Sequence, residues 1–247
     1  MHGDGGAGHE IIAFSTPVRA VGNIEDWLLE LHRKMQLTMK DITRNCASDL
    51  TQVMGDVGQL RSFTDNYIAQ FSLLGIQMLW TAENQLALET CRTKKGSMKD
   101  CNSRQLEILR EMSSWCLQDL GSKVNRRKIE TMVTIHVHQR DVSNEIAGLV
   151  KSRKVQDAND FEWLKQARFY WKPTSSDEIS ADGASIITIT DVDFAYQFEY
   201  LGAKERLVIT PLTDRCYITL AQAMGMFFGG APAGPAGTGK TETTKDL

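Results

Sequence analysis

One short stretch near the end of the sequence has the residue types and spacing for phosphate chemistry. The motif "GPAGTGKT", residues 234–241, fits the pattern G-x-x-x-x-G-K-[ST] completely. In such a loop, glycines let consecutive backbone N–H groups turn towards an anion, and the following helix adds its positive end. Lys240 would reach the β and γ phosphates, and Thr241 would place a hydroxyl on Mg²⁺. The motif therefore predicts a nucleoside triphosphate site.

The simpler interpretation of this stretch is a flexible Gly/Pro linker. The flanking sequence favours the phosphate loop. The segment "MFFGGAPAG", residues 226–234, is apolar enough for a buried strand, and "TETTKDL", residues 241–247, has the composition of a first helical turn. We therefore expect a strand, a loop and a helix in succession.

Binding a triphosphate is not the same as hydrolysing it. Hydrolysis needs a second carboxylate that holds Mg²⁺, a group that orients the attacking water, and in most cases an arginine. These groups usually follow the helix after the loop. Upstream, Asp191 and Asp193 lie in a predicted hairpin, where an exposed polar face is the favoured interpretation. We expect this chain to bind phosphate without forming a complete ATPase site.

Three other groups of residues could carry chemistry. His136 and His138 would share a face only in a strand, but the surrounding pattern is helical, which favours surface or half-buried side chains over metal ligands. The basic loop at residues 92–99 has no interleaved aromatic residues, so a solvated loop is favoured over a nucleic-acid contact. The aromatic cluster "FEWLKQARFYW", residues 161–171, could dock a partner, although core packing is favoured.

The composition is that of an ordinary globular protein. The 247 residues carry a net charge of -3, so no global field would attract nucleic acid or an anionic membrane. No apolar run approaches the roughly 18 to 20 residues that cross a bilayer. The five cysteines are scattered and never spaced as C-x-x-C, which argues against a disulfide framework or a zinc site. We expect an intracellular protein with reduced thiols.

Most of the chain has helical periodicity. Apolar stripes predict helices from Asn23, from residue 60 towards residue 86, through residues 106–120, over residues 124–150, and from Asn159 or Asp160 to Pro173. Glycines at 55 and 58 and a loop at residues 91–101 separate the first three. Five amphipathic segments in succession predict a helical bundle.

After residue 183 the period changes to two. Apolar and polar residues alternate through residues 187–200, and the phase slips at Asp191, which predicts a β-hairpin with a turn or bulge there. A short strand is expected at residues 207–209. Pro211 would end it, and Thr213 or Asp214 would cap a helix that leads to the phosphate loop.

Several segments together resemble the dynein heavy chains. They include "FSLLGIQMLWTAE" and "DFEWLKQARFYW", which look like parts of the dynein linker, and "ITDVDFAYQFEYLG", which looks like the hairpin after it. Residues 205–247 resemble the entry into the first AAA+ module and its phosphate loop. The amino-acid sequence of the loop is more similar to that of axonemal dyneins than to that of cytoplasmic dyneins, and among axonemal dyneins an outer-arm type is preferred.

The Gly-rich start of the chain predicts a flexible leader at residues 1–20, which the resemblance does not cover. For the rest, the resemblance implies a mainly α fold in two parts, of which the first, a linker-like helical region ending in a β-hairpin, would occupy residues 21–203. Residues 204–247 would form the strand, phosphate loop and helix that begin an α/β AAA+ domain. In this family, ATP binding and hydrolysis at the first AAA+ site drive a swing of the linker across a six-module ring.

The resemblance also implies ATP and Mg²⁺ as cofactors. By motif match, the binding residues would be Gly234, Pro235, Ala236, Gly237, Thr238, Gly239, Lys240 and Thr241, the last of these as the Mg²⁺ ligand. The adenine would be approached by Leu207, Val208, Ile209 and Pro211. The parent protein would work in the cytoplasm and cytoskeleton, in the axoneme of a cilium or flagellum. Its partners, microtubules and dynein intermediate and light chains, would bind parts absent from this chain.

The chain departs from the family by truncation, since the Mg²⁺-binding carboxylate strand (Walker B), the sensors and the arginine finger are absent. The leading hypothesis is a fragment of a microtubule motor ATPase. The alternative is a non-catalytic helical interaction protein of dynein origin. A small stand-alone P-loop NTPase would need its carboxylate strand upstream of the loop, and no suitable apolar strand ending in Asp is found there.

Overall fold

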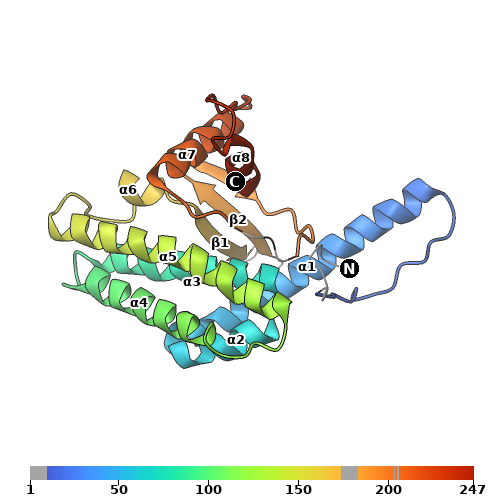
Figure 1. Ribbon diagram of the computed structural model, residues 1–247, viewed down its shortest axis with the longest axis horizontal. Helices are drawn as coiled ribbons and strands as arrows, with labels where there is room; N and C mark the ends of the chain where they lie inside the picture. Colours follow the sequence, from blue (N-terminus) through green and yellow to red (C-terminus); the bar gives the residue numbers. More distant parts are fainter. Residues whose placement is uncertain (1–9, 174–182, 203, 205) are drawn as a thin grey trace.

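The structure, a computed structural model, describes residues 10–173, 183–202, 204 and 206–247. Residues 1–9 of the predicted leader and most of the predicted loop "KPTSSDEISADG" lie outside the described residues. The described part is mainly helical with one small antiparallel sheet, as expected (Figure 1). None of its helices is both long and apolar enough to cross a membrane.

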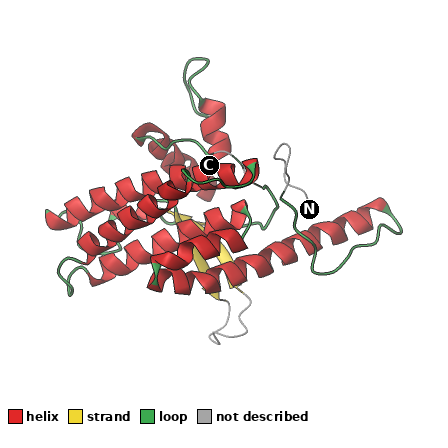
Figure 2. Ribbon diagram, turned by 60° about the horizontal axis from the view of Figure 1, so that its bottom comes forward, coloured by secondary structure: helices red, strands yellow, loops and turns green. Residues whose placement is uncertain are grey.

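The helical bundle is built from five helices and one short 3₁₀ turn. Their bounds are α1 Ile24–Gly55, η1 Val57–Gln59, α2 Leu60–Asn66, α3 Ala69–Thr90, α4 Ser97–Trp115 and α5 Lys123–Lys151. The predicted start of α1 after Asn23 and its end at Gly55 are confirmed, but the Asn23 side chain does not cap the helix; its amide donates to the Asp26 carboxylate at 3.3 Å. The first half of α1 projects away from the other helices in both views (Figure 1, Figure 2).

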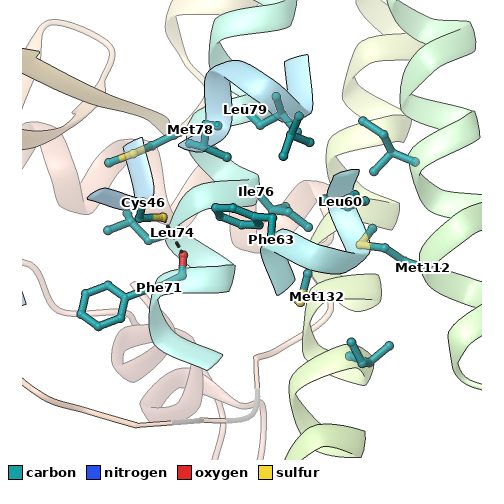
Figure 3. Close-up of a cluster of buried hydrophobic side chains, with 14 of the residues drawn as sticks. Cys46, Leu60, Phe63, Phe71, Leu74, Ile76, Met78, Leu79, Met112 and Met132 are labelled. Atoms are coloured by element: carbon teal, nitrogen blue, oxygen red, sulfur yellow. Dashed lines mark hydrogen bonds between the residues drawn. The ribbon is translucent and has the colours of Figure 1, made fainter. Parts of the chain in front are cut away.

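The helix α3 is the centre of the bundle. Most of its residues are buried on every side, because it packs against α1, α4, α5 and the sheet. Figure 3 shows one part of this core, in which the Cys46 thiol of α1 donates a hydrogen bond to the Phe71 carbonyl of α3 at 3.5 Å. A second cluster, with Trp80 and Trp163 at its centre, covers the other end of α3.

The apolar stripe from residue 60 to residue 86 forms two helices rather than one. The break is at Tyr67 and Ile68, whose backbones are extended. Tertiary partners satisfy the broken ends, since the Lys128 ammonium donates to the Tyr67 carbonyl at 2.7 Å and the Glu10 carboxylate accepts from the Ala69 N–H at 2.9 Å. Those partners are distant in sequence, so the stripe alone could not predict the break.

The boundaries of α4 also differ from the prediction. The helix begins at Ser97, directly after Gly96 with φ +95°, so part of the predicted loop at residues 91–101 is helical. It ends at Trp115 rather than at Gly121. Leu120 is buried in the connection that follows. The next helix, α5, begins and ends within one residue of its prediction, and the Ser122 hydroxyl caps it.

The predicted fifth helix is wrong beyond its first turn. Only Phe161–Leu164 is helical (α6), and Arg168–Pro173 forms the strand β1. Aromatic residues at 169–171 suit a strand as well as a helix, and pairing with a neighbouring strand decides between the two. The strand also lies on α3, because the Thr81 hydroxyl of that helix accepts from the Phe169 N–H at 3.0 Å.

The predicted hairpin is confirmed. The strands β2 (Gly183–Ile189) and β3 (Val192–Ala195) are antiparallel, with Ile187 opposite Phe194, and the turn includes Asp191. The sheet order is β1-β2-β3. The strand β3 ends at Ala195, but half-buried and exposed residues continue to alternate as far as residue 200.

The last part of the chain holds α7 (Pro211–Gly225) and α8 (Lys240–Asp246). Two predicted strands, at residues 207–209 and 226–234, are not formed. A strand needs a hydrogen-bonded neighbour, and no described strand pairs with either segment. The cap prediction was one turn late, because Thr210 caps α7 in a box with Thr213, and Pro211 is the first helical residue. In Figure 1 the sheet lies between the bundle and these two helices.

The contact between α1, α2 and α3 depends on Gly75. A methyl group added there would lie 2.5 Å from the Phe63 ring and 3.1 Å from the Cys46 sulfur. We expect Gly75→Ala to lower the free energy of unfolding by about 1 to 3 kcal/mol through overpacking, measured by urea denaturation. The matched control is Gly148→Ala on α5, where a methyl group would meet no atom within 4 Å. That change should raise stability by about 0.4 to 1 kcal/mol, and equal effects of the two substitutions would contradict this packing.

Candidate functional site

The predicted phosphate loop forms an exposed turn before α8. Gly237 and Gly239 have φ of +79° and +75°, a left-handed conformation that glycine adopts without strain. The Lys240 side chain folds back over the loop, and its ammonium donates to the carbonyls of Gly234 at 2.8 Å and Pro235 at 2.5 Å. The loop therefore holds its lysine close to its own backbone.

The helix after the loop is anchored at its far end by Asp246. This carboxylate accepts hydrogen bonds from the Arg206 guanidinium at 2.8 Å, the Leu207 N–H at 3.2 Å and the Tyr217 hydroxyl at 2.8 Å. The Asp246 side chain is only 4% exposed. Burial, together with the bond to this carboxylate, raises the pKa of Tyr217. One carboxylate thus joins α8 to α7 and to the segment before α7.

Of the four residues expected near adenine, only Leu207 is hydrogen-bonded to Asp246. Leu207 is bonded to Asp246, which lies at the opposite end of α8 from Lys240. Val208 is 72% exposed, and Pro211 is the first residue of α7. The structure therefore brings the start of this segment to α8 rather than to the loop. Sequence reasoning missed Arg206 and Asp246, which are 40 residues apart and carry no local signal of their pairing.

The two upstream aspartates serve the hairpin, as predicted. Asp193 accepts from the Thr188 hydroxyl of the neighbouring strand at 2.6 Å. Asp191 is exposed and accepts from the Gln222 amide of α7 at 2.7 Å, a bond that lowers the pKa of that carboxyl. The same amide contacts the Thr190 hydroxyl. These contacts fix α7 to the tip of the hairpin, which was not predicted.

The histidine pair lies on α5, as the helical pattern predicted. The prediction of surface or half-buried side chains is wrong for His136, which is 1% exposed because α5 turns it into the bundle, where its ring nitrogens contact the Gln105 carbonyl at 3.1 Å and the Gln139 amide at 3.3 Å. Burial lowers the pKa of His136 to about 4. Within residues 10–173, 183–202, 204 and 206–247, no cluster of three or more His, Cys, Asp or Glu side chains is suited to a metal ion.

Comparison with known families finds one match at the end of the chain. The family described as the hydrolytic ATP-binding site of the dynein motor region matches residues 196–247. The matched segment contains the whole loop, α7, α8 and the chain that leads into them from the hairpin.

Comparison with curated proteins finds relatives along nearly the whole chain. It is 48% identical over 239 residues to the dynein gamma chain of the flagellar outer arm of Chlamydomonas reinhardtii, and 48% identical over 238 residues to dynein axonemal heavy chain 5 of Rattus norvegicus. These alignments cover 97% and 96% of this chain. Dynein axonemal heavy chain 2 of Homo sapiens is 39% identical over 247 residues. The chain spans about 5% of the length of these relatives.

The anchor of α8 can be tested by removing the charge of Asp246. We expect Asp246→Asn to weaken hydrogen bonds to a charged group worth about 1.5 to 3 kcal/mol, so amide exchange in residues 240–247 should accelerate about tenfold or more. Hydrogen exchange with mass spectrometry measures this. Glu242→Gln, on the same helix, removes only an exposed pair with Lys245 and should change exchange little. Equal amide exchange rates of residues 240–247 in the two variants would contradict the conclusion that Asp246 holds α8 in place.

The buried histidine predicts a pH dependence of stability. A folded pKa of about 4 lies below the unfolded value of 6.5, so the neutral ring stabilises the fold above pH 6.5 and this stability is lost as the pH falls towards 4. The full effect is about 3 kcal/mol. His136→Gln should flatten the pH profile of the free energy of unfolding in that range. The exposed His32, changed to Gln, should leave it unaltered. A profile as steep in His136→Gln as in the wild type would refute the prediction.

Proposed function

Over 97% of its length the chain is homologous to one segment of axonemal dynein heavy chains, and from this premise we propose that residues 234–241 bind the triphosphate of ATP. The observation that carries the proposal is the position of the complete loop motif inside the segment that matches a dynein ATP-binding site. The structure adds glycines in left-handed conformation and a lysine that already lies over the loop.

The residues of the loop suit an anion. Backbone N–H groups of residues 236–239 would surround the phosphates, because Gly237 and Gly239 allow the turns that this requires; Pro235 has no N–H to donate. The Lys240 ammonium now bonds to two carbonyls, and a triphosphate would compete with them for it. A fully charged phosphate group is the stronger partner for an ammonium. We expect ligand binding to move this side chain from the loop to the phosphates.

The remaining roles follow the motif. Thr241 is exposed at the start of α8, where its hydroxyl would join the Mg²⁺ coordination shell. Mg²⁺ would neutralise phosphate charge and orient the β and γ groups. Adenine would lie along the segment before α7, against Leu207, Val208, Ile209 and Pro211. In the structure this segment reaches α8 through Asp246.

We assign motor activity to the larger protein. Hydrolysis needs a second Mg²⁺-binding carboxylate, a group that positions water, and an arginine, none of which the loop itself supplies. In the larger protein, ATP binding and hydrolysis at this first AAA+ site would drive a swing of the helical linker, residues 21–203, and movement along microtubules. The relatives named for the axoneme and the flagellar outer arm support a place in the cytoskeleton of a cilium or flagellum. Microtubules and other dynein chains would be the partners there.

Nucleotide binding by the chain is tested with Lys240→Ala. Loss of the ammonium should weaken binding of ATP with Mg²⁺ at least about tenfold, since a charged partner of the phosphates is removed. Isothermal titration calorimetry measures the affinity, and the thermal unfolding midpoint controls for folding. Lys245→Ala, one turn later on the same helix and exposed, should bind like the wild type.

Two outcomes would count against the proposal. Equal affinity of the Lys240→Ala and wild-type chains would place nucleotide elsewhere. Failure of the folded wild-type chain to bind nucleotide would favour the alternative, a helical interaction protein without nucleotide chemistry.

A further inference from the structure

The segment between the sheet and the phosphate-loop region is neither helix nor strand. Residues 196–202, which we call the connector, follow β3 and run along the bundle. Tyr196, Phe198 and Tyr200 pack their rings against the main core cluster. Phe198 has φ +55°, which interrupts the strand geometry and is uncommon for a bulky residue. The Tyr196 N–H still donates to the Ser185 carbonyl of β2 at 3.0 Å, and beyond that residue the connector is held by contacts with the bundle.

One side chain of the bundle, Gln70, makes four hydrogen bonds to the connector. The Gln70 amide, near the start of α3, donates to the Tyr196 hydroxyl at 2.6 Å and to the Glu199 carbonyl at 2.7 Å. Its carbonyl oxygen accepts from the N–H groups of Leu201 at 2.9 Å and Gly202 at 3.2 Å. Gln70 is 8% exposed. The bond to the Gly202 N–H is buried and the other three are partly buried, so leaving these groups unpaired would be costly chiefly at Gly202.

The Gln70 amide takes the place of a neighbouring strand, because it bonds to backbone groups of the connector. A primary amide presents a carbonyl and an N–H, as a peptide group does, so one side chain can satisfy both kinds of backbone group. Gln70 does this at three positions of the connector, 199, 201 and 202. A hydrophobic residue of the same size would fill the space and leave these groups unpaired.

The helix α7 is held at a second point by another glutamine. Gln222 contacts Thr190 and Asp191 at the tip of the hairpin. Gly225, at the end of α7, lies so close to Val192 that an added methyl group would come within 2.6 Å of it. Asp246 then joins α8 to α7 and to Leu207. The phosphate-loop region is therefore fixed to the bundle through the connector and through the hairpin tip.

We propose that Gln70 is a positioning residue that fixes the connector on α3, so that α7, α8 and the phosphate loop keep one orientation relative to the helical bundle. The geometric part of the proposal stands without nucleotide. Its functional part rests on the proposed function, because a fixed connector would pass a change at the loop to the bundle, whereas a loose one would absorb it.

The test is hydrogen exchange with mass spectrometry on the full 247-residue chain. Gln70→Leu keeps the volume and removes all four bonds, so exchange at the amides of Leu201 and Gly202 should accelerate at least about tenfold. Exchange in α7 and α8 should rise several-fold. The backbone amides of helices α4 and α5 should exchange as in the wild type, because Gln70 makes none of its hydrogen bonds to these helices.

Two further variants separate positioning from stability. Gln70→Glu keeps the acceptor for Leu201 and Gly202 but loses the donor to the Glu199 carbonyl, so its connector should exchange at an intermediate rate. Gln77→Leu removes an amide from the same helix at the same 8% exposure, and its connector should exchange as in the wild type. Unchanged connector exchange in Gln70→Leu would overturn the proposal. So would a uniform rise that includes α4 and α5, because that pattern indicates a general loss of stability.

A second arm adds ATP with Mg²⁺ to the wild-type and Gln70→Leu chains. In the wild type, protection should extend from the loop to the connector. In Gln70→Leu, protection of the loop should remain, and protection of the connector should be lost. Retained protection of the connector in that variant would overturn the coupling. Absence of any protection by ATP would refute the proposed function, and the first arm would still decide whether Gln70 fixes the connector.

Discussion

The need to enclose α3 on every side governs this fold. Most residues of that helix are buried, including polar ones such as Gln70, Glu83 and Asn84, so it cannot lie on a surface. The helices α1, α4 and α5 cover part of it, and β1 and the aromatic rings of the connector cover the rest. The sheet is therefore part of the cover of the bundle, which explains why so small a sheet is stable here.

The sheet and the connector, which cover α3, also determine where the loop at residues 234–241 lies relative to the bundle. The connector continues directly into the segment before α7, and α7 rests on the hairpin tip through Gln222. Asp246 then holds α8, so that the packed helices and the loop at residues 234–241 form one connected body. The polar groups that make these joints, Gln70, Gln222 and Asp246, each satisfy several partners at once, and this multiplicity distinguishes them from ordinary surface contacts.

Local signals in the sequence predicted what depends on local physics. The start of α1 after Asn23, the length of α5, the slip at Asp191 and the turns that glycine permits in the loop all follow from neighbouring residues. Predictions failed where distant partners decide. The break at Tyr67 depends on Lys128 and Glu10, and the aromatic segment after α6 is a strand because β2 lies beside it. The contacts that hold the loop region are made between side chains far apart in the sequence, and hydrophobic periodicity does not predict such pairs.

The central claim is that residues 234–241 receive a triphosphate while the loop region stays fixed to the bundle. A crystal structure of the chain with Mg²⁺ and a non-hydrolysable ATP analogue tests it most directly. We expect phosphates within the loop, the Lys240 ammonium moved from the Gly234 carbonyl to a phosphate oxygen, and Gln70 still bonded to the connector. A nucleotide bound elsewhere, with Lys240 still on the loop carbonyls, would contradict it.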